Sequence, residues 1–440
     1  MKLKKIELKN FYQFKDFTLD LTYPMGHPKE GQPLDKVCFI GQSGTGKTTL
    51  LKLIKYSIDD LFSEQHKSFQ FPNNPCKIEF EFDFKDSNFI YHGPSNQGQR
   101  IEGQFTTSHF KSKQNINEKK DIQYYLVDAV ANQKTQYIYY PAEMTYIRNA
   151  SIENTSKIRI DFDKLQGASG LNFVLDKIKI YREYYLDFLL KLDNRIQRDN
   201  SIDYNQERKK WSDENENPVE DLAKNCLDKL LNRFHLKTKT EFDDINKIDL
   251  QVVNLNTNQE IPFHNLSTGT KQIICTAIPL YMKHPDEAII LFDEPERSLY
   301  PDIQSEIIDV YTSLAEGSQF FFATHSAIIL SNFEPWEIVE LKFDEQDSEN
   351  IVRDKYYRGE NHVDNYFIDP RYMRWDTIYQ KVYDFLPDGN SKERTPKLIE
   401  LAMLEEKLKK MKSEKADKDL IDKTWEEYKK LAEKIGWETE

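Results

Sequence analysis

One short stretch constrains this chain more than any other: Gly41-Gln-Ser-Gly-Thr-Gly-Lys-Thr48. An apolar run at residues 37–40 precedes it and a leucine-rich run at residues 49–54 follows it, so a predicted strand and a predicted helix flank the loop. Glycines let backbone N–H groups turn inward around a phosphate chain, and the N-terminus of the following helix adds a partial positive charge. With both flanks in place, this spacing predicts a phosphate-binding loop. The alternative is a glycine-rich turn with a chance lysine.

The loop residues have candidate roles in holding a nucleoside triphosphate with Mg²⁺. Lys47 supplies a positive charge for the β- and γ-phosphates, and the Thr48 hydroxyl is a candidate Mg²⁺ ligand. The candidate phosphate-binding residues are Gly41, Gln42, Ser43, Gly44, Thr45, Gly46, Lys47, Thr48 and Thr49.

Length and charge limit what else the chain can be. A chain of 440 residues exceeds one compact core, so two or three modules are expected. Its net charge of −13 means that any contact with nucleic acid must come from a local basic patch. The four cysteines lack metal-ligand spacing and indicate free thiols in a reducing cytoplasm, which is the expected localisation. No apolar run approaches the ~18 residues of a membrane span and no signal peptide precedes the first strand, so no membrane contact is expected.

Strands are predicted in separate groups. Residues 1–22 indicate two strands, and residues 76–84 alternate between apolar and charged side chains, as in a half-buried strand of an antiparallel sheet. Residues 286–293 and 319–324 are apolar runs that alternate with a helical pattern, which is typical of a parallel sheet. The polar residues 94–120 predict a loop.

Helices are predicted in the middle and at the end of the chain. Apolar residues at helical spacing indicate one helix across residues 175–196, and a second helix follows a polar loop or helix tip at residues 195–218. The stripe of that second helix consists of Leu222, Cys226, Leu230 and Phe234. Beyond about residue 345 the composition changes, and residues 401–411 and 421–435 predict two amphipathic helices.

Two apolar strands end in side chains that could carry chemistry. Asp293 follows the first strand and is a candidate Mg²⁺ ligand, because a hard cation prefers oxygen. Glu294 comes next and is a candidate for orienting or deprotonating an attacking water. His325 follows the second strand; a lone histidine would more often be structural.

Three segments resemble motifs of ABC-type ATPases: Leu266-Ser-Thr-Gly-Thr-Lys-Gln272, Glu294-Pro-Glu-Arg-Ser-Leu-Tyr-Pro301 and Phe320-Phe-Phe-Ala-Thr-His-Ser326. The first resembles the signature loop, which in that family caps the γ-phosphate bound by the other subunit, and this implies binding roles for Ser267 and Gly269. Thr270 departs from the usual Gln or Glu, and an ordinary turn before a helix is the alternative.

The second segment resembles the D-loop and implies Ser298 and Leu299 at the subunit interface, although Tyr300 replaces the usual histidine. The third makes His325 resemble the switch histidine that hydrogen-bonds the γ-phosphate.

The chain as a whole resembles stand-alone ABC-type ATPases of the SMC, RecF and OLD group. The resemblance implies an α/β fold: an ABC-type P-loop NTPase head with a mixed sheet and an antiparallel β lobe, a helical insertion and a mainly helical C-terminal extension. The expected domains are ATPase lobes at residues 1–170 and 241–345, the insertion at 171–240, and an extension for assembly or partner docking at 346–440. It also implies hydrolysis of ATP, with Mg²⁺, between the heads of a homodimer or higher homo-oligomer. Gln136 and Glu143 are weak candidates for the glutamine that joins the insertion to the metal.

Three functions stay open. The segment from Asp293 to Pro301 resembles ATPase subunits of anti-phage defence systems such as PARIS, Septu, retron and restriction-associated systems. That resemblance implies a sensor or scaffold subunit with a separate effector, such as a nuclease. The alternative is a RecF-like DNA-repair ATPase, whose nucleic-acid contact would be the basic and aromatic residues 353–375, unless their tyrosines simply pack on the ATPase lobe. A transporter ATPase subunit is a third hypothesis and would need a membrane partner.

Overall fold

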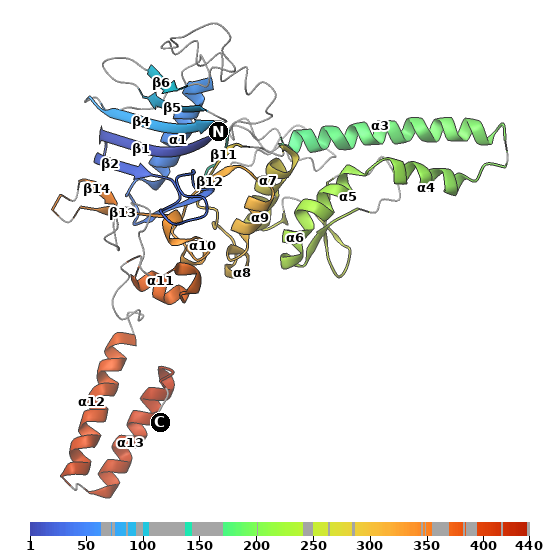
Figure 1. The fold of residues 1–440 in the computed structure, drawn as a ribbon. Coiled ribbons are helices and arrows are strands. Elements are labelled where there is room, and N and C mark those ends of the chain that lie inside the picture. The colour runs from blue at the N-terminus through green and yellow to red at the C-terminus, as the bar shows by residue number, and fades with distance from the viewer. Residues whose placement is uncertain are drawn as a thin grey trace. The chain divides into compact units, whose positions relative to one another are not determined.

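The computed structural model describes most of the chain. The described residues are 1–62, 72, 75–84, 87–93, 100–104, 137–142, 170–199, 201–240, 250–262, 265–283, 287–344, 346–347, 349–353, 369–381, 383, 394–414 and 417–437. The chain divides into two compact units, Met1–Met373 and Arg374–Glu440 (Figure 1). Each unit is described by itself.

A mainly parallel sheet forms the centre of the first unit. In sheet order its described strands are β14 (Ile351–Arg353), β13 (Ile338–Phe343), β3 (Lys36–Gly41), β12 (Gln319–Ala323), β11 (Ile289–Asp293) and β7 (Tyr137–Tyr140). All neighbours from β13 to β7 are parallel, and only β14 is antiparallel among these six. Every residue of β11 and β12 is buried, which confirms the parallel-sheet prediction for residues 286–293 and 319–324.

An antiparallel sheet forms the second layer. Its order is β2 (Phe14–Asp20), β1 (Lys2–Phe11), β4 (Lys77–Phe84), β5 (Ser87–His92) and β6 (Arg100–Gln104). The strands predicted at residues 1–22 and 76–84 are therefore confirmed. The loop predicted for residues 94–120 is wrong at β6, which pairs with β5 through backbone groups that side-chain composition does not reveal. The rest of that stretch lies outside the described residues.

Helix α1 (Lys47–Phe62) shares one hydrophobic core with both sheets. The buried cluster includes Leu8 of β1, Ile54 of α1 and Leu291 of β11. The Gln319 side chain, fully buried, accepts a hydrogen bond from the Leu3 N–H and donates to the carbonyls of Leu3 and Leu34. This amide ties the antiparallel sheet to β12, because its polar groups would be costly to bury without partners.

The helical insertion is a hairpin with an extra helix. Its elements are α3 (Gly170–Ile196), α4 (Tyr204–Glu214), α5 (Pro218–Leu222), a π-helical turn (Ala223–Leu227), α6 (Asp228–Leu231) and a 3-10 turn (Asn232–Phe234). Figure 1 shows α3 running out from α7 (Thr268–Lys283), with α4 returning beside it. The polar residues 195–218, predicted as a loop or helix tip, instead contain a separate helix, α4, which begins after the N-cap Asp203. Leu222, Cys226 and Leu230 are buried as predicted, whereas Phe234 is only partly buried.

Short elements complete the first unit. A small antiparallel sheet contains β10 (Glu260–Ile261), β9 (Val252–Asn254) and β8 (Leu236–Thr238). Other helices among its described residues are α8 (Pro301–Gln304), α9 (Ile307–Ser313), α10 (Ala327–Leu330) and 3-10 turns at Pro335–Glu337 and Pro370–Tyr372.

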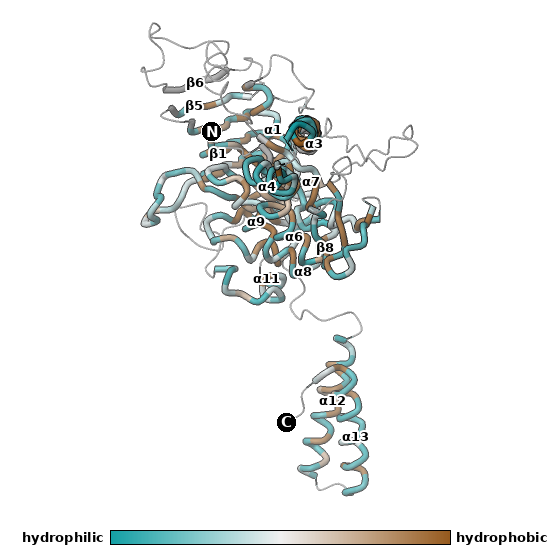
Figure 2. The backbone as a smooth tube through the Cα atoms, turned by 90° about the vertical axis from the view of Figure 1, so that its right-hand side faces the viewer, coloured by the Kyte–Doolittle hydropathy of each residue, from teal (hydrophilic) through white to brown (hydrophobic). Residues whose placement is uncertain are grey.

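The second unit contains α11 (Trp375–Lys381), α12 (Arg394–Ser413) and α13 (Lys418–Lys434). Along α12 and α13 the chain alternates between hydrophilic and hydrophobic residues (Figure 2). Leu401 and Leu408 of α12 pack with Tyr428 and Leu431 of α13, which confirms the two amphipathic helices. In both units, no described helix is long and apolar enough to cross a membrane.

Candidate functional site

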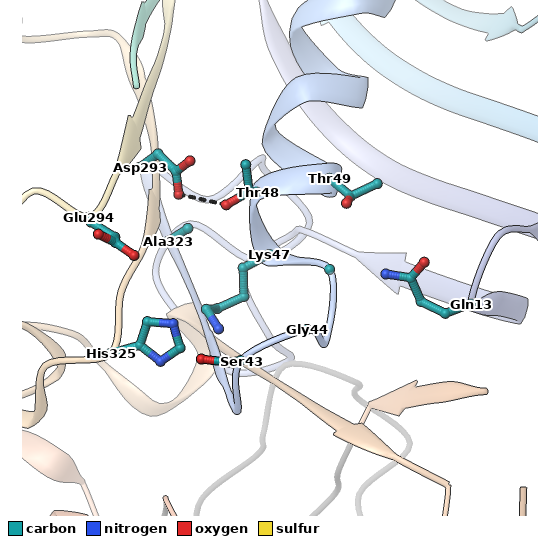
Figure 3. Close-up of a pocket in the computed structure, with 11 residues that line it drawn as sticks. Gln13, Ser43, Gly44, Lys47, Thr48, Thr49, Asp293, Glu294, Ala323 and His325 are labelled. Atoms are coloured by element: carbon teal, nitrogen blue, oxygen red, sulfur yellow. Dashed lines mark hydrogen bonds between the residues drawn. The ribbon is translucent and has the colours of Figure 1, made fainter. Parts of the chain in front are cut away.

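A pocket of about 220 Å³ lies where β3, β11 and β12 end at one edge of the parallel sheet. Carboxyl ends of parallel strands are a common place for ligands in α/β folds. The lining residues are Gln13, Ser43, Gly44, Gly46, Lys47, Thr48, Thr49, Asp293, Glu294, Ala323 and His325. The structure therefore brings together residues from the glycine-rich loop with the candidates Asp293, Glu294 and His325 (Figure 3).

The glycine-rich loop has a backbone that side chains would prevent. Gly46 has φ +93°, in the left-handed region that favours glycine. A Cβ at this position would lie 2.5 Å from Gln13 Nε2 and 2.6 Å from Phe14 Cζ. The loop is thus pressed against the turn between β1 and β2, and any larger residue at position 46 would displace one of them.

Lys47 is a buried cation at the centre of this pocket. Its side chain donates hydrogen bonds to the carbonyls of Gly41 (2.8 Å) and Gln42 (3.0 Å), and the residue is 6% exposed. Burial lowers the pKa of Lys47 to about 8, although the charges of Asp293 and Glu294 favour the protonated form. A bound anion would therefore relieve an unfavourable environment for this ammonium group.

Thr48 and Asp293 place two side-chain oxygens, both possible metal ligands, next to each other. The Thr48 hydroxyl donates to Asp293 Oδ1 at 3.0 Å, shown as the dashed line in Figure 3. Burial raises the pKa of Asp293, and the hydrogen bond from Thr48 opposes that shift. The pair fits a hard cation such as Mg²⁺, which takes few protein oxygens and completes its shell with phosphate and water. The described residues contain no cluster of three or more His, Cys, Asp or Glu side chains suited to a metal.

Glu294 lies at a strained backbone position. Its φ of +52° is in the left-handed region, which is uncommon for residues other than glycine. The Glu294 N–H donates to the Ala323 carbonyl at 2.8 Å and its own carbonyl accepts from the Arg297 N–H at 3.1 Å, so the surrounding turn holds the strain. This conformation aims the carboxylate into the pocket on the same side of Lys47 as His325 in the view of Figure 3.

His325 is held through its backbone by a residue that the sequence did not single out, Glu296. Glu296 Oε1 accepts hydrogen bonds from the Thr324 hydroxyl (2.7 Å) and from the His325 N–H (3.0 Å). Burial raises the pKa of Glu296, while burial and the charge of Lys47 lower the pKa of His325. The imidazole is accordingly neutral near pH 7 and can offer one donor and one acceptor.

A second residue missed from the sequence is Gln13, in the turn between β1 and β2. Its side chain lines the pocket opposite Glu294 and His325 in Figure 3. Its backbone carbonyl accepts a hydrogen bond from the Ile351 N–H at 2.8 Å. No motif marks position 13. The only signal for Glu296 was a second glutamate in the run Asp293-Glu-Pro-Glu296.

The signature-like residues Ser267 and Gly269 do not line this pocket. They begin α7, where the Ser267 Oγ accepts from the Thr270 N–H (3.1 Å) and lies 2.8 Å from the Thr270 hydroxyl. The residue that departs from the family motif, Thr270, thus caps its own helix with Ser267. A Cβ at Gly269 would lie 2.4 Å from the Ser298 carbonyl, so glycine lets the D-loop-like segment approach.

The D-loop-like segment is held in place on its inner side. Gln272 donates to the Pro295 carbonyl (3.1 Å), Arg297 donates to the Ala142 carbonyl (2.9 Å) and Gln304 donates to the Leu299 carbonyl (2.9 Å). Leu299 is buried, whereas Ser298 and Tyr300 are exposed. The weak candidates Gln136 and Glu143 lie outside the described residues.

Comparisons with known proteins add to this geometry. No curated protein matches the chain in sequence. A crystal structure described as the SmcHead bound to the C-winged helix domain of ScpA is 13% identical, with a TM-score of 0.43, and 80% of this chain covers 97% of it. The SMC head domain from Thermotoga maritima is 14% identical, with a TM-score of 0.40 and coverage of 80% and 99%. An Smc head domain with an extended coiled coil, bound to the C-terminal domain of ScpA derived from Pyrococcus furiosus, is 13% identical, with a TM-score of 0.41 and coverage of 80% and 96%.

The predicted fold class, an α/β P-loop NTPase head with a mixed sheet and an antiparallel layer, is confirmed. The family whose sequence profile matches the chain is described as "AAA ATPase domain", and the match extends over residues 1–330. Because this match covers well over half of the 440 residues, the chain belongs to the AAA ATPase domain family.

Proposed function

We propose that this protein binds ATP with Mg²⁺ in the pocket at the end of β3 and hydrolyses it only when a second copy closes over the nucleotide. The glycine-rich loop and Lys47 would hold the phosphates, and Thr48 and Asp293 would hold the cation. Glu294 would orient the attacking water, and His325 would contact the γ-phosphate. Lys47, Thr48, Asp293, Glu294 and His325 already line the pocket. Of the loop residues predicted to bind phosphate, Gly41, Gln42 and Thr45 do not line it.

One observation carries the proposal of a shared site. The signature-like residue Ser267 is exposed at the start of α7 and does not line the pocket of its own chain. The D-loop-like Ser298 is exposed as well, with φ +62°, and Gly269 packs against it. Two motifs that resemble nucleotide-contacting loops thus face outward together, as expected if they complete the site of another copy.

The test compares the oligomeric state of two variants. Glu294→Gln should bind ATP, hydrolyse it slowly and accumulate as a dimer, so its mass by sedimentation should double when ATP is added. Adding Ser267→Arg to that variant should keep ATP binding and abolish the ATP-dependent dimer, because a large cation would meet the partner's nucleotide site. Ser413→Arg is the matched control, since Ser413 is an exposed serine near the end of α12. A dimer that forms equally well with Ser267→Arg, or full hydrolysis by a monomer, would refute the shared site.

We further propose that the ATPase is the sensor or scaffold subunit of an anti-phage defence system with a separate effector, such as a nuclease. The support is the resemblance of residues 293–301 to such subunits. The C-terminal extension, residues 346–440, is the proposed docking element, and Ile399 and Met403 are 54% and 65% exposed one helical turn apart on α12. Copurification with the products of neighbouring genes, with and without ATP, tests this role, and Ile399→Glu with Met403→Glu should weaken retention.

The alternative is direct action on DNA through residues 353–375. Most of that segment lies outside the described residues, and Arg371 is engaged in ion pairs with Asp369 (2.5 Å) and Glu334 (2.7 Å). Tyr372 and Trp375 are exposed and would be available for stacking on bases. A DNA affinity that falls steeply with salt would favour this alternative, and no affinity at moderate salt would favour the defence role.

A further inference from the structure

A second cavity, of about 420 Å³, lies within the helical insertion. Its walls include Tyr181 and Tyr184 of α3, Trp211 of α4, and the carboxylates Glu214, Glu216 and Asp221 near the ends of α4 and α5. We call this cavity the aromatic–acidic pocket. Neither the phosphate loop nor the signature-like segment contributes to it.

Ring packing fixes the aromatic wall of the pocket. The Trp211 ring lies 5.4 Å from Tyr181, 4.8 Å from Tyr185 and 5.4 Å from Phe188, measured between centroids. These separations are typical of stabilising aromatic pairs, so Trp211 is held in one orientation. Tyr184, by contrast, is 67% exposed and presents its ring to solvent at the pocket.

The charges of the pocket favour a cation. Three carboxylates line it against one ammonium group, that of Lys177. Glu214 and Glu216 are exposed, and within the described parts of the chain their side chains have no hydrogen-bond or ion-pair partner. Asp221 already accepts hydrogen bonds from the Tyr281 hydroxyl and the Asn225 amide, both at 2.7 Å, which fixes its carboxylate in position.

The insertion already seats one guanidinium on the same aromatic cluster. The Arg208 guanidinium lies 5.8 Å from the Tyr185 centroid and 5.6 Å from the Tyr204 centroid, and its Nε donates to the Tyr185 hydroxyl at 2.7 Å. A planar, weakly hydrated guanidinium is well suited to such ring faces. Arg208 does not line the aromatic–acidic pocket, and no other arginine among the described residues does.

We propose that the aromatic–acidic pocket binds an arginine side chain presented by a second polypeptide. The guanidinium stacks against the rings of Tyr184 and Trp211, and Glu214 and Glu216 supply the countercharge. The cavity lies within the size range of ligand pockets. Its ring faces suit the planar shape of a guanidinium, and its carboxylates suit the positive charge. No residue lines both this pocket and the pocket at the end of β3, so we expect the arginine to bind in the absence of ATP.

The experiment uses the full-length protein and three labelled peptides of otherwise identical sequence. Two positions hold arginine in the first peptide, lysine in the second and citrulline in the third. The citrulline side chain is neutral and has nearly the same shape as that of arginine. Fluorescence anisotropy should show the arginine peptide binding at least about tenfold more tightly than the citrulline peptide. Equal binding of the citrulline peptide would overturn the proposal. Tighter binding of the lysine peptide would overturn the choice of a guanidinium.

Matched variants separate the pocket from the general acidity of the protein. Glu214→Lys with Glu216→Lys should lose about tenfold in affinity for the arginine peptide, whereas Glu406→Lys with Glu433→Lys changes the net charge equally and should stay within about twofold. Tyr184→Ser should weaken binding while Tyr184→Phe, which keeps the ring, should not. Tyr184, Glu214 and Glu216 are exposed, so these substitutions leave the fold intact. An equal loss in the two charge-reversal variants would refute a specific pocket.

Discussion

The phosphate-loop side and the signature side of the ATPase unit differ in what each contacts within one chain. On the phosphate-loop side, Lys47 is 6% exposed and Thr48 is hydrogen-bonded to Asp293 across 245 positions of sequence. On the signature side, Ser267 and Ser298 are exposed, and Tyr300 is 71% exposed. The phosphate-loop side lines the pocket at the end of β3, whereas the exposed serines of the signature side do not line that pocket.

On the signature side, the chain's own contacts hold the backbone in place and leave the two serines exposed. The D-loop-like segment is fixed from within by Gln272, Arg297 and Gln304, which all donate to its backbone or to the chain beside it. Such preorganisation lowers the entropy lost on association, because the surface is ordered before a partner arrives. The phosphate-loop side should therefore govern nucleotide binding alone, and the signature side should govern hydrolysis through a second copy.

The largest effect is expected for Lys47→Ala. Removing the buried cation takes away the charge that faces the phosphates, so ATP affinity should fall by at least about 100-fold, which corresponds to about 2.7 kcal/mol. Equilibrium dialysis with labelled ATP measures this loss. Tight nucleotide retention by Lys47→Ala would contradict this division of roles, because the phosphate-loop side would then not be the nucleotide site.

The next effect concerns hydrolysis without a loss of binding. Glu294→Gln keeps the shape of the side chain and removes its basicity, so turnover should fall by about 100-fold while ATP affinity changes by less than about threefold. Phosphate release under saturating ATP gives the rate. Asp309→Asn is a control, since Asp309 is an exposed carboxylate on α9 that does not line the pocket. Unchanged turnover in Glu294→Gln would remove this residue from the role of orienting water.

Glu296 is the residue through which the two sides should communicate. It lies between Pro295, which accepts from α7, and His325, whose N–H it holds. Glu296→Ala leaves the Thr324 hydroxyl and the His325 N–H without their acceptor. Thr324 is a buried residue, and a buried polar group without a partner costs about 1–3 kcal/mol, so urea unfolding should show a loss of about 1 kcal/mol or more. Turnover should fall by about tenfold with little change in ATP affinity.

The isosteric change Glu296→Gln provides the control for that prediction. It keeps an oxygen acceptor for both hydrogen bonds, so stability and turnover should remain close to those of the natural protein. If Glu296→Ala destabilises the fold but leaves turnover per folded molecule unchanged, Glu296 only stabilises the fold and does not position His325.

The sequence predicted the parts of the site that follow strands and missed those that depend on tertiary approach. Asp293 and His325 could be located because each lies at or just after the end of a buried apolar strand, and Lys47 because it lies in the glycine-rich loop that follows β3. The carboxyl ends of these parallel strands meet at one edge of the sheet. Gln13 could not be found, because its place in the pocket comes from the packing of the β1–β2 turn against Gly46. The strand β6 was missed for a related reason, since its pairing with β5 uses backbone groups.

The smallest effect is a proton taken up when ATP binds. Burial holds the pKa of Lys47 at about 8 in the nucleotide-free protein, below its usual range, so the side chain is protonated well below pH 8 and neutral well above it. A triphosphate beside Lys47 would raise that pKa again, because an opposite charge favours the charged form. Binding should therefore take up about 0.9 proton at pH 9 and about 0.1 at pH 7, and ATP affinity should fall by up to about tenfold between these pH values. Calorimetry in two buffers with different ionisation enthalpies measures the uptake, and Lys47→Arg, which stays charged throughout, should show almost none. Proton uptake that is the same at both pH values would mean that the phosphate-loop side does not bind the triphosphate through Lys47.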